Sequence, residues 1–307
     1  MVYLLLAIAL LCLTIKGYCG KKSSTYAENN RQVLLFNLVR LLFCIPVSLG
    51  LLLFSRGGLL LPEGGMLAIG FLSGIANASF LVGWMLAVQK NTMVAVDVTL
   101  TLGSLLPALL CALLFSEPLS LSKMLGFALI LLASFILSKS GGGKGGVVGL
   151  PFLLLAVLGD GMVGFSQQLF KQYYTENGVY AHGVFYSEAI FHFYTYIFAT
   201  LLLFSVFLVT CVKERRAPKA PRSLVPSLLR ALPYIAVMAA CLFLANDAQL
   251  RVSADYGMSS QILYPVMKGG CLITANITAL FFGERFTKRT ALGTFTALCG
   301  ILCTNLL

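Results

Sequence analysis

Long runs of apolar residues, separated by short polar segments, dominate this chain. The run at 64–88 holds no charged residue. A run of about 20 apolar residues crosses the hydrocarbon core of a bilayer as one helix. Ten such runs predict membrane-spanning helices at 2–19, 33–55, 64–88, 92–115, 121–138, 148–171, 183–211, 231–251, 257–282 and 289–307. The pattern therefore predicts an all-α integral membrane protein.

Two polar connections stand out among the short ones. "SKSGGGKGG" at 138–146 is a glycine-rich linker at the midpoint, and "KERRAPKAPR" at 213–222 is a basic loop that contains proline. The first connection divides the chain into 1–140, a linker at 141–147, and 148–307. Inside the spans, Pro107 and Pro265 are expected to interrupt the fourth and ninth helices, because proline removes an intrahelical hydrogen bond.

The two halves repeat one another. "LLFSEPLS" (Leu113–Ser120) returns as "LFFGERFT" (Leu280–Thr287), and "YLLLAIAL" near the start resembles "FLLLAVLG" after the linker. The first match aligns Glu117 with Glu284, Gly126 with Gly293, and Gly103 with Gly270. Each half then holds five predicted helices. Because five is odd, the second half enters the membrane from the opposite face, which is the inverted-topology repeat common in secondary transporters.

Both halves resemble a known family. A helix that ends in glutamate, a short polar step and a glycine-bearing helix occur in "LLFSEPLSLSKMLGFALILLASFIL" and "LFFGERFTKRTALGTFTALCGIL". This pattern is similar to the EamA unit of the drug/metabolite transporter superfamily, and it covers nearly the whole chain. The resemblance implies a secondary active transporter of a small polar or amphipathic metabolite, or of a drug-like compound, working by alternating access. It identifies no particular substrate.

Composition supports a membrane protein and orients it. The chain is 59% hydrophobic and only 11% charged, whereas soluble domains usually carry about 25% charged residues. Sixteen of the 22 lysines and arginines fall in predicted loops on one side, and four fall on the other. Because cytoplasmic loops carry the excess of positive charge, both termini are predicted to lie outside, although proteins similar to this family usually keep them in the cytoplasm. Compact loops favour a bacterial cytoplasmic membrane.

The deepest charges in the predicted spans are Asp160 and Lys268. An ionisable group at this depth costs roughly 2.5–3.5 kcal/mol on insertion scales, and such groups usually face a cavity. We expect the two to face one cavity and to pair when no substrate is bound. A zwitterionic or anionic substrate would then split the pair. The alternative is a permanent structural ion pair.

A second candidate group lies on the seventh predicted helix. Glu188, His192 and Tyr196 recur every fourth residue, which puts them on one helical face. Glu188 with His192 is a candidate for proton coupling, since imidazole titrates near neutral pH. A polar seam between packed helices is the alternative.

Four further side chains are candidates for contacting a polar ligand: Gln167, Asn77, Trp84 and Asn246. Trp84 fits simple packing as well as stacking on a ligand. Asn246, Asp97 and Asp247 lie nearer the ends of their predicted spans, so a wet vestibule is the alternative position for all three. Glu117 and Glu284 are expected to be structural caps of the helices that follow them.

The sequence also indicates what is absent. Nine scattered cysteines and two histidines give no metal-ligand spacing, and no cofactor or nucleotide-binding segment is predicted. The expected partners are a small-molecule substrate and the lipid bilayer, with no nucleic acid, and the protein is expected to be a monomer or homodimer. A non-transporting membrane subunit and a membrane-embedded enzyme remain the alternative functions.

Overall fold

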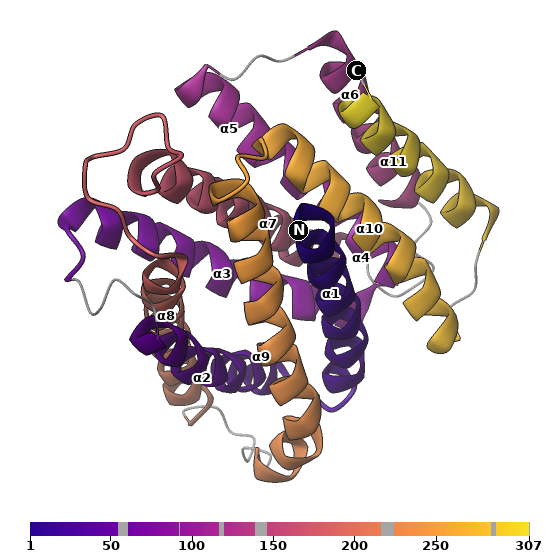
Figure 1. The fold of residues 1–307 in the computed structure, drawn as a ribbon. Coiled ribbons are helices and arrows are strands. Elements are labelled where there is room, and N and C mark those ends of the chain that lie inside the picture. Colours follow the sequence, from indigo (N-terminus) through magenta and orange to yellow (C-terminus); the bar gives the residue numbers. More distant parts are fainter. Residues whose placement is uncertain are drawn as a thin grey trace.

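The computed structural model describes residues 1–54, 61–91, 93–116, 120–138, 146–215, 224–283 and 287–306, and within these ranges the secondary structure is entirely helical (Figure 1). The predicted all-α class is therefore confirmed. Seven helical segments are long and apolar enough to cross a membrane, so the chain is a multi-pass membrane protein. This criterion does not recover all ten predicted spans. Glu117, Glu284 and positions 141–145 of the predicted linker lie outside the described residues.

The helices follow the predicted runs with shifted ends. They are α1 (Val2–Ser24), α2 (Asn30–Phe54), α3 (Gly64–Lys90), α4 (Met93–Leu100), η1 (Thr101–Ser104), α5 (Leu105–Phe115), α6 (Leu121–Ser138), α7 (Gly146–Tyr174), α8 (Glu188–Arg215), α9 (Val225–Ala254), α10 (Ser260–Phe281) and α11 (Lys288–Leu306). Helix α1 runs past its predicted end at 19. There Lys21 Nζ donates to the carbonyls of Val88 and Asn91 at 3.0 and 3.3 Å, which holds the polar end of α1 against α3.

The predicted first residues of two helices were wrong. Helix α8 begins at Glu188 rather than at 183, because the residues before it fold back on α7: the Tyr186 amide donates to the Tyr174 carbonyl at 3.1 Å. Helix α9 begins at Val225 rather than at 231. Pro226 fits that first turn because amides there need no intrahelical acceptor.

The predicted fourth helix is interrupted, and the predicted ninth is not. The 3₁₀ turn η1 separates α4 from α5 and ends three residues before Pro107. Pro107 has no amide to donate to the Gly103 carbonyl, which explains an interruption at this point. By contrast, α10 continues through Pro265 from Ser260 to Phe281.

The helix pairs in closest contact join the two halves of the chain. Helix α3 packs on α7 and α8, α9 packs on α1 and α2, and α6 packs on α11. In Figure 1, α6 and α11 lie side by side at one edge, and α2 and α8 lie toward the opposite edge. Glycines allow the α3–α7 contact: a Cβ at Gly83 would lie 2.7 Å from the Ala156 amide, and one at Gly159 would lie 2.5 Å from that of Phe80. Small residues serve close helix packing in lipid in this way.

Most of the helix contacts are retained when the halves are exchanged. Let α1, α2, α3, α4–α5 and α6 correspond in order to α7, α8, α9, α10 and α11. The α3–α7 contact then becomes α9–α1, and the α3–α8 contact becomes α9–α2. The α2–α8, α4–α10 and α6–α11 contacts each map onto themselves.

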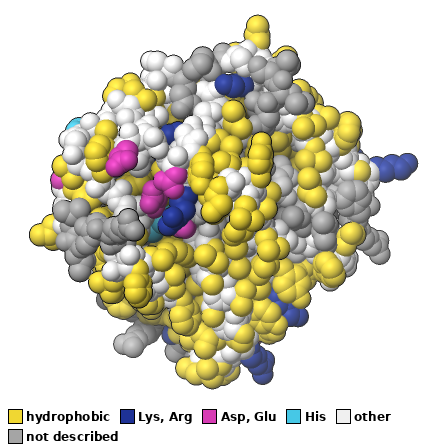
Figure 2. Space-filling view, viewed as in Figure 1, with side chains coloured by type: hydrophobic (Ala, Val, Ile, Leu, Met, Phe, Trp, Pro, Cys, Tyr) yellow, Lys and Arg dark blue, Asp and Glu magenta, His cyan; other side chains and the backbone are white. Residues whose placement is uncertain are grey.

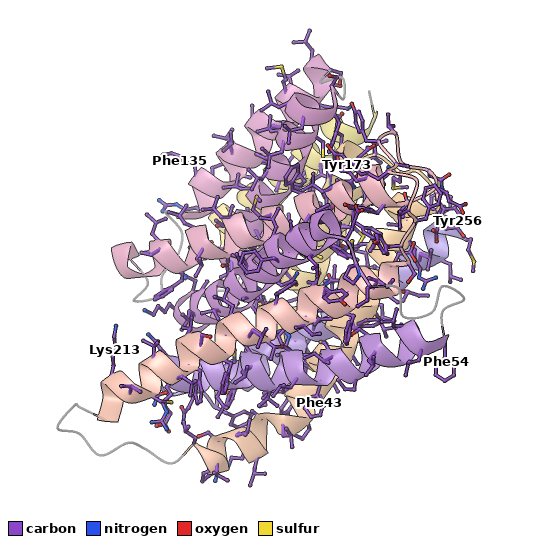
Figure 3. The ribbon with its side chains drawn as sticks, turned by 90° about the vertical axis from the view of Figure 1, so that its left-hand side faces the viewer. Phe43, Phe54, Phe135, Tyr173, Lys213 and Tyr256 are labelled. Carbon is purple, nitrogen blue, oxygen red and sulfur yellow. The ribbon has the colours of Figure 1, made fainter. Side chains whose placement is uncertain are left out.

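The outward faces are apolar and the interior holds polar side chains. Hydrophobic side chains cover much of the face in Figure 2. Over the molecule as a whole, the exposed ones include Phe71, Phe135 and Leu201. Large exposed apolar patches are rare on soluble monomers, so this surface suits lipid. Figure 3 places Lys213 at one end of the molecule and Phe54 and Tyr256 at the other. Phe54 ends α2, and Tyr256 follows the end of α9, whereas Lys213 lies near the end of α8. Helix α8 therefore runs opposite to α2 and α9.

Candidate functional site

Asp160 and Lys268 form an ion pair between α7 and α10. Lys268 Nζ lies 2.7 Å from Asp160 Oδ1 and 2.6 Å from Oδ2, and the two side chains are only 18% and 14% exposed. Gly103 in η1 makes room for the pair, because a Cβ there would lie 2.5 Å from Asp160 Oδ2. The predicted pairing is confirmed, and Gly103, in the 3₁₀ turn between α4 and α5, lies against it.

The pair faces a cavity of about 90 Å³, several times the roughly 10–15 Å³ that one water requires. Its walls come from α1, α3, α4, η1, α5, α7, α9 and α10, so both halves of the chain contribute. Four charged side chains line it: Lys16, Asp97, Asp160 and Lys268. A charged cavity among apolar helices can bind a polar solute away from lipid.

Three other predicted site residues line the same cavity. Trp84 and Asn77 reach it from α3, and Asn246 reaches it from α9. Asn77 Nδ2 donates to the Ser73 carbonyl at 3.0 Å, and Asn246 Nδ2 donates to Tyr196 Oη at 3.3 Å. The carbonyl oxygens of both amides are thus left with capacity to accept hydrogen bonds. The structure places these residues together without assigning them a role.

Gln167 does not line the cavity and reaches it through Tyr264. Tyr264 Oη lies 2.7 Å from the Gly164 carbonyl and 3.1 Å from Gln167 Oε1, as a donor toward both. Tyr264 and Gly164 are wall residues of the cavity. Gln167 therefore supports a cavity tyrosine that the sequence analysis overlooked.

The predicted proton-coupling pair is separated in the structure. Within the described chain, His192 forms no hydrogen bond or ion pair with Glu188. Its Nε2 instead lies 4.0 Å from Asp247 Oδ1, while Asp247 Oδ2 accepts from Arg251 Nε at 2.8 Å. The His192 ring is stacked on Tyr196 at 6.1 Å, as the shared helical face predicted. The carboxylate beside this imidazole therefore comes from α9, which local spacing on α8 could not reveal.

Two cations in the membrane interior were overlooked. The count of loop charges placed Lys16 in the loop after the first predicted span. In the structure α1 continues to Ser24. The Lys16 side chain is 7% exposed, and its Nζ lies 5.1 Å from the centroid of the Phe80 ring. Arg40 on α2 is fully buried. The signals were present in the sequence: the apolar run continues beyond Lys16 to Cys19, and Arg40 lies well inside a predicted span.

The cavity carries carboxylates and amines but no metal-type cluster. Among the described residues, no three histidine, cysteine, aspartate or glutamate side chains are grouped to hold a metal ion. A comparison with protein-family models found no match, and a comparison with curated proteins found none either.

Proposed function

We propose that this chain is a secondary active transporter that moves a small polar or amphipathic metabolite, or a drug-like compound, by alternating access. The observation that carries the proposal is a charged cavity built from both halves of the chain. Residues 1–140 supply Lys16 and Asp97, and residues 148–307 supply Asp160 and Lys268. Ionisable groups within membrane helices face cavities and mark solute or ion pathways.

The ten-helix architecture of two inverted repeats belongs to the same proposal. Its support is the packing pattern, in which exchanging the halves turns the α3–α7 contact into α9–α1. Inverted halves enclose a site near the midplane and open it alternately to either side by rocking. Membership of the EamA family rests on the sequence pattern of the two glutamate-ended helices.

In this proposal Asp160 and Lys268 anchor the substrate, and Trp84, Asn77 and Asn246 surround it. A bound charge would compete with one member of the ion pair and loosen the contact between α7 and α10. Proton coupling would use His192. Its ring is stacked on Tyr196, which accepts a hydrogen bond from the cavity residue Asn246. His192 is therefore connected to the cavity residue Asn246 through the side chain of Tyr196.

The proposed location is a bacterial cytoplasmic membrane with both termini outside. The support is the uneven distribution of lysine and arginine among the loops, which favours a cytoplasmic position for the charged side.

The alternative to proton coupling is exchange, in which the movement of one solute drives that of another in the opposite direction.

Uptake into sealed proteoliposomes tests the function. The panel consists of amino acids, sugars, nucleosides and organic acids, each with and without an imposed proton gradient. We expect saturable flux of one class, reduced roughly 30-fold or more in Asp160→Asn and Lys268→Met, as when one partner of a buried charge pair is removed. Lys213→Met, at an exposed position, is the control and should transport normally.

The outcomes separate the functions. Flux that survives both cavity substitutions would keep the transporter and remove these two residues from its site. Absence of flux for every compound, in protein shown to be folded, would favour the non-transporting subunit. A membrane-embedded enzyme would instead convert a compound without moving it, which product analysis of the same vesicles detects.

A further inference from the structure

Lys16 presents a cation to the cavity without a carboxylate partner. Its side chain is 7% exposed, and Nζ lies over the Phe80 ring at 5.1 Å from the centroid. It forms no salt bridge with any residue in the described ranges. The face of an aromatic ring attracts a cation, but more weakly than the water that burial removes. The site thus holds a positive charge that is only partly compensated.

Arg40 on α2 is a second cation without a hydrogen-bond partner among the described residues, and it is not part of the cavity lining. The side chain is fully buried, and in the part of the chain that the structure describes Nε, Nη1 and Nη2 have no hydrogen-bond partner. A guanidinium has five N–H donors, and buried donors are nearly always bonded. Its positive charge acts on that of Lys16, and Tyr196 is among its neighbours. Tyr196 in turn accepts a hydrogen bond from the wall residue Asn246.

The charges around the cavity do not balance. Among the described residues, the cations Lys16, Lys268 and Arg40 outnumber the two carboxylates of the cavity wall, Asp97 and Asp160. Asp160 is committed to Lys268 at 2.6 Å. Asp97 shares the cavity wall with Trp84 and interacts with the charges of both lysines. Asp247, on the cavity-lining helix α9, is paired with Arg251 at 2.8 Å. One positive charge is therefore in excess, on the side of Lys16 and Arg40.

We propose that the substrate is a small organic anion, bearing a carboxylate or a phosphate group, that binds Lys16. This inference rests on the proposed transport function and gives it a substrate class. Arg40 raises the positive potential at Lys16 and holds the anion through its field, since a charge in a low-dielectric interior acts over a longer range than in water. A cation would be repelled by this arrangement. A zwitterion also carries an ammonium group. That group would have to draw Asp97 away from the two lysines with whose charges it interacts.

If Arg40 had a purely structural role, Arg40→Met should lower the melting temperature. A buried charge without a partner destabilises a fold, and replacing it by an apolar residue of similar size is neutral or stabilising. If Arg40 serves the substrate, Arg40→Met should keep or raise the melting temperature while anion affinity falls. Arg40→Lys should retain part of the affinity because it keeps the charge.

Ligand-induced thermal stabilisation of the purified protein tests the proposal without relying on flux. The probes are succinate, glucose 6-phosphate and inorganic phosphate as anions, alanine as a zwitterion, choline as a cation and glucose as a neutral solute. We expect at least one organic anion to raise the melting temperature, with its apparent Kd weakened roughly 30-fold or more in Lys16→Met. The matched control is Lys90→Met, since Lys90 also lies over an aromatic ring, Phe152, at 4.5 Å but outside the cavity.

The same probes in proteoliposomes separate this inference from the proposed function. Stabilisation by an anion without flux supports the anion site and rejects the transporter. Flux and stabilisation by alanine, choline or glucose alone keep the transporter and overturn the anion. Stabilisation by inorganic phosphate and glucose 6-phosphate but not succinate identifies a phosphate site, and the reverse result identifies a carboxylate site. No stabilisation by any anion, or equal stabilisation in Lys16→Met, overturns the proposal.

Discussion

Lys268 on α10 contacts both carboxylate oxygens of Asp160 on α7, at 2.7 and 2.6 Å. Removing one partner leaves a buried, unpaired charge, which costs about 3–5 kcal/mol in fully buried pairs. The exposure of 14–18% places the expected loss below that range. Asp160→Asn should therefore lower the melting temperature in detergent, and the double variant Asp160→Leu with Lys268→Met should recover most of it.

Transport by the double variant distinguishes a substrate-anchoring pair from a permanent structural pair. If the pair anchors substrate, the double variant should be stable and inactive. A permanent structural pair predicts the opposite: the double variant should regain transport together with stability. The measurement is the initial rate of proteoliposome uptake for each variant, normalised to the amount of folded protein recovered by gel filtration.

Gly103→Ala should disturb the pair without touching either charge. The added Cβ would lie 2.5 Å from Asp160 Oδ2 and 3.2 Å from the Val157 carbonyl. Overpacking of this kind typically costs about 1–3 kcal/mol, and it would push the carboxylate away from Lys268. We expect lower melting temperature and reduced uptake. Gly50→Ala is the control, because a Cβ there meets nothing within 4 Å; an equal loss in both variants would contradict the assignment.

The pairing of Asp160 with Lys268 could be predicted because few charges lie deep in the apolar runs, and charges in a membrane interior need compensation. The partner of His192 could not. Asp247 and His192 meet only because α8 and α9 cross at that point, and their sequence separation carries no signal of it. Asp97, expected in a vestibule, lines the same cavity as Asp160 and Lys268, because α4 packs against α7 and α10.

Lys16 shows a different limit. The chain turns polar shortly after it, so hydropathy alone ends the first span near this residue. In the structure α1 continues to Ser24, because Lys21 finds carbonyl acceptors at the end of α3. Long-range contacts of this kind extend a helix beyond its apolar run. A count of loop residues missed this charge, although the apolar run that continues past Lys16 to Cys19 indicates it.

A terminal reporter tests the predicted orientation. If both termini are outside, a C-terminal fluorescent protein that matures only in the cytoplasm should stay dark. The same reporter inserted between Arg215 and Leu224 should fluoresce, because that connection lies on the side richer in lysine and arginine. Bright signal from the C-terminal fusion, with a dark internal insertion, would reverse the orientation and would agree with the usual arrangement of the resembled family.

Tyr264 and Gln167 should act as a unit at the wall of the cavity. Tyr264→Phe removes the donor to the Gly164 carbonyl and to Gln167 Oε1. Each lost hydrogen bond costs about 0.5–1.5 kcal/mol, and more when a buried group is left unpaired. Gln167 is 2% exposed, so it has little access to water. We expect Tyr264→Phe to lower thermal stability and Gln167→Leu to do the same.

A double-mutant cycle decides how Gln167 affects transport. Because Gln167 reaches the cavity only through Tyr264, the double variant should lose less stability and less transport than the two single losses added together. Additive losses would mean that Gln167 contacts substrate on its own in another conformation. Thr210→Val is the control, since its hydroxyl also donates to a helical carbonyl, that of Val206 at 2.8 Å, but at an exposed position. It should leave transport and its coupling to Tyr264 unchanged.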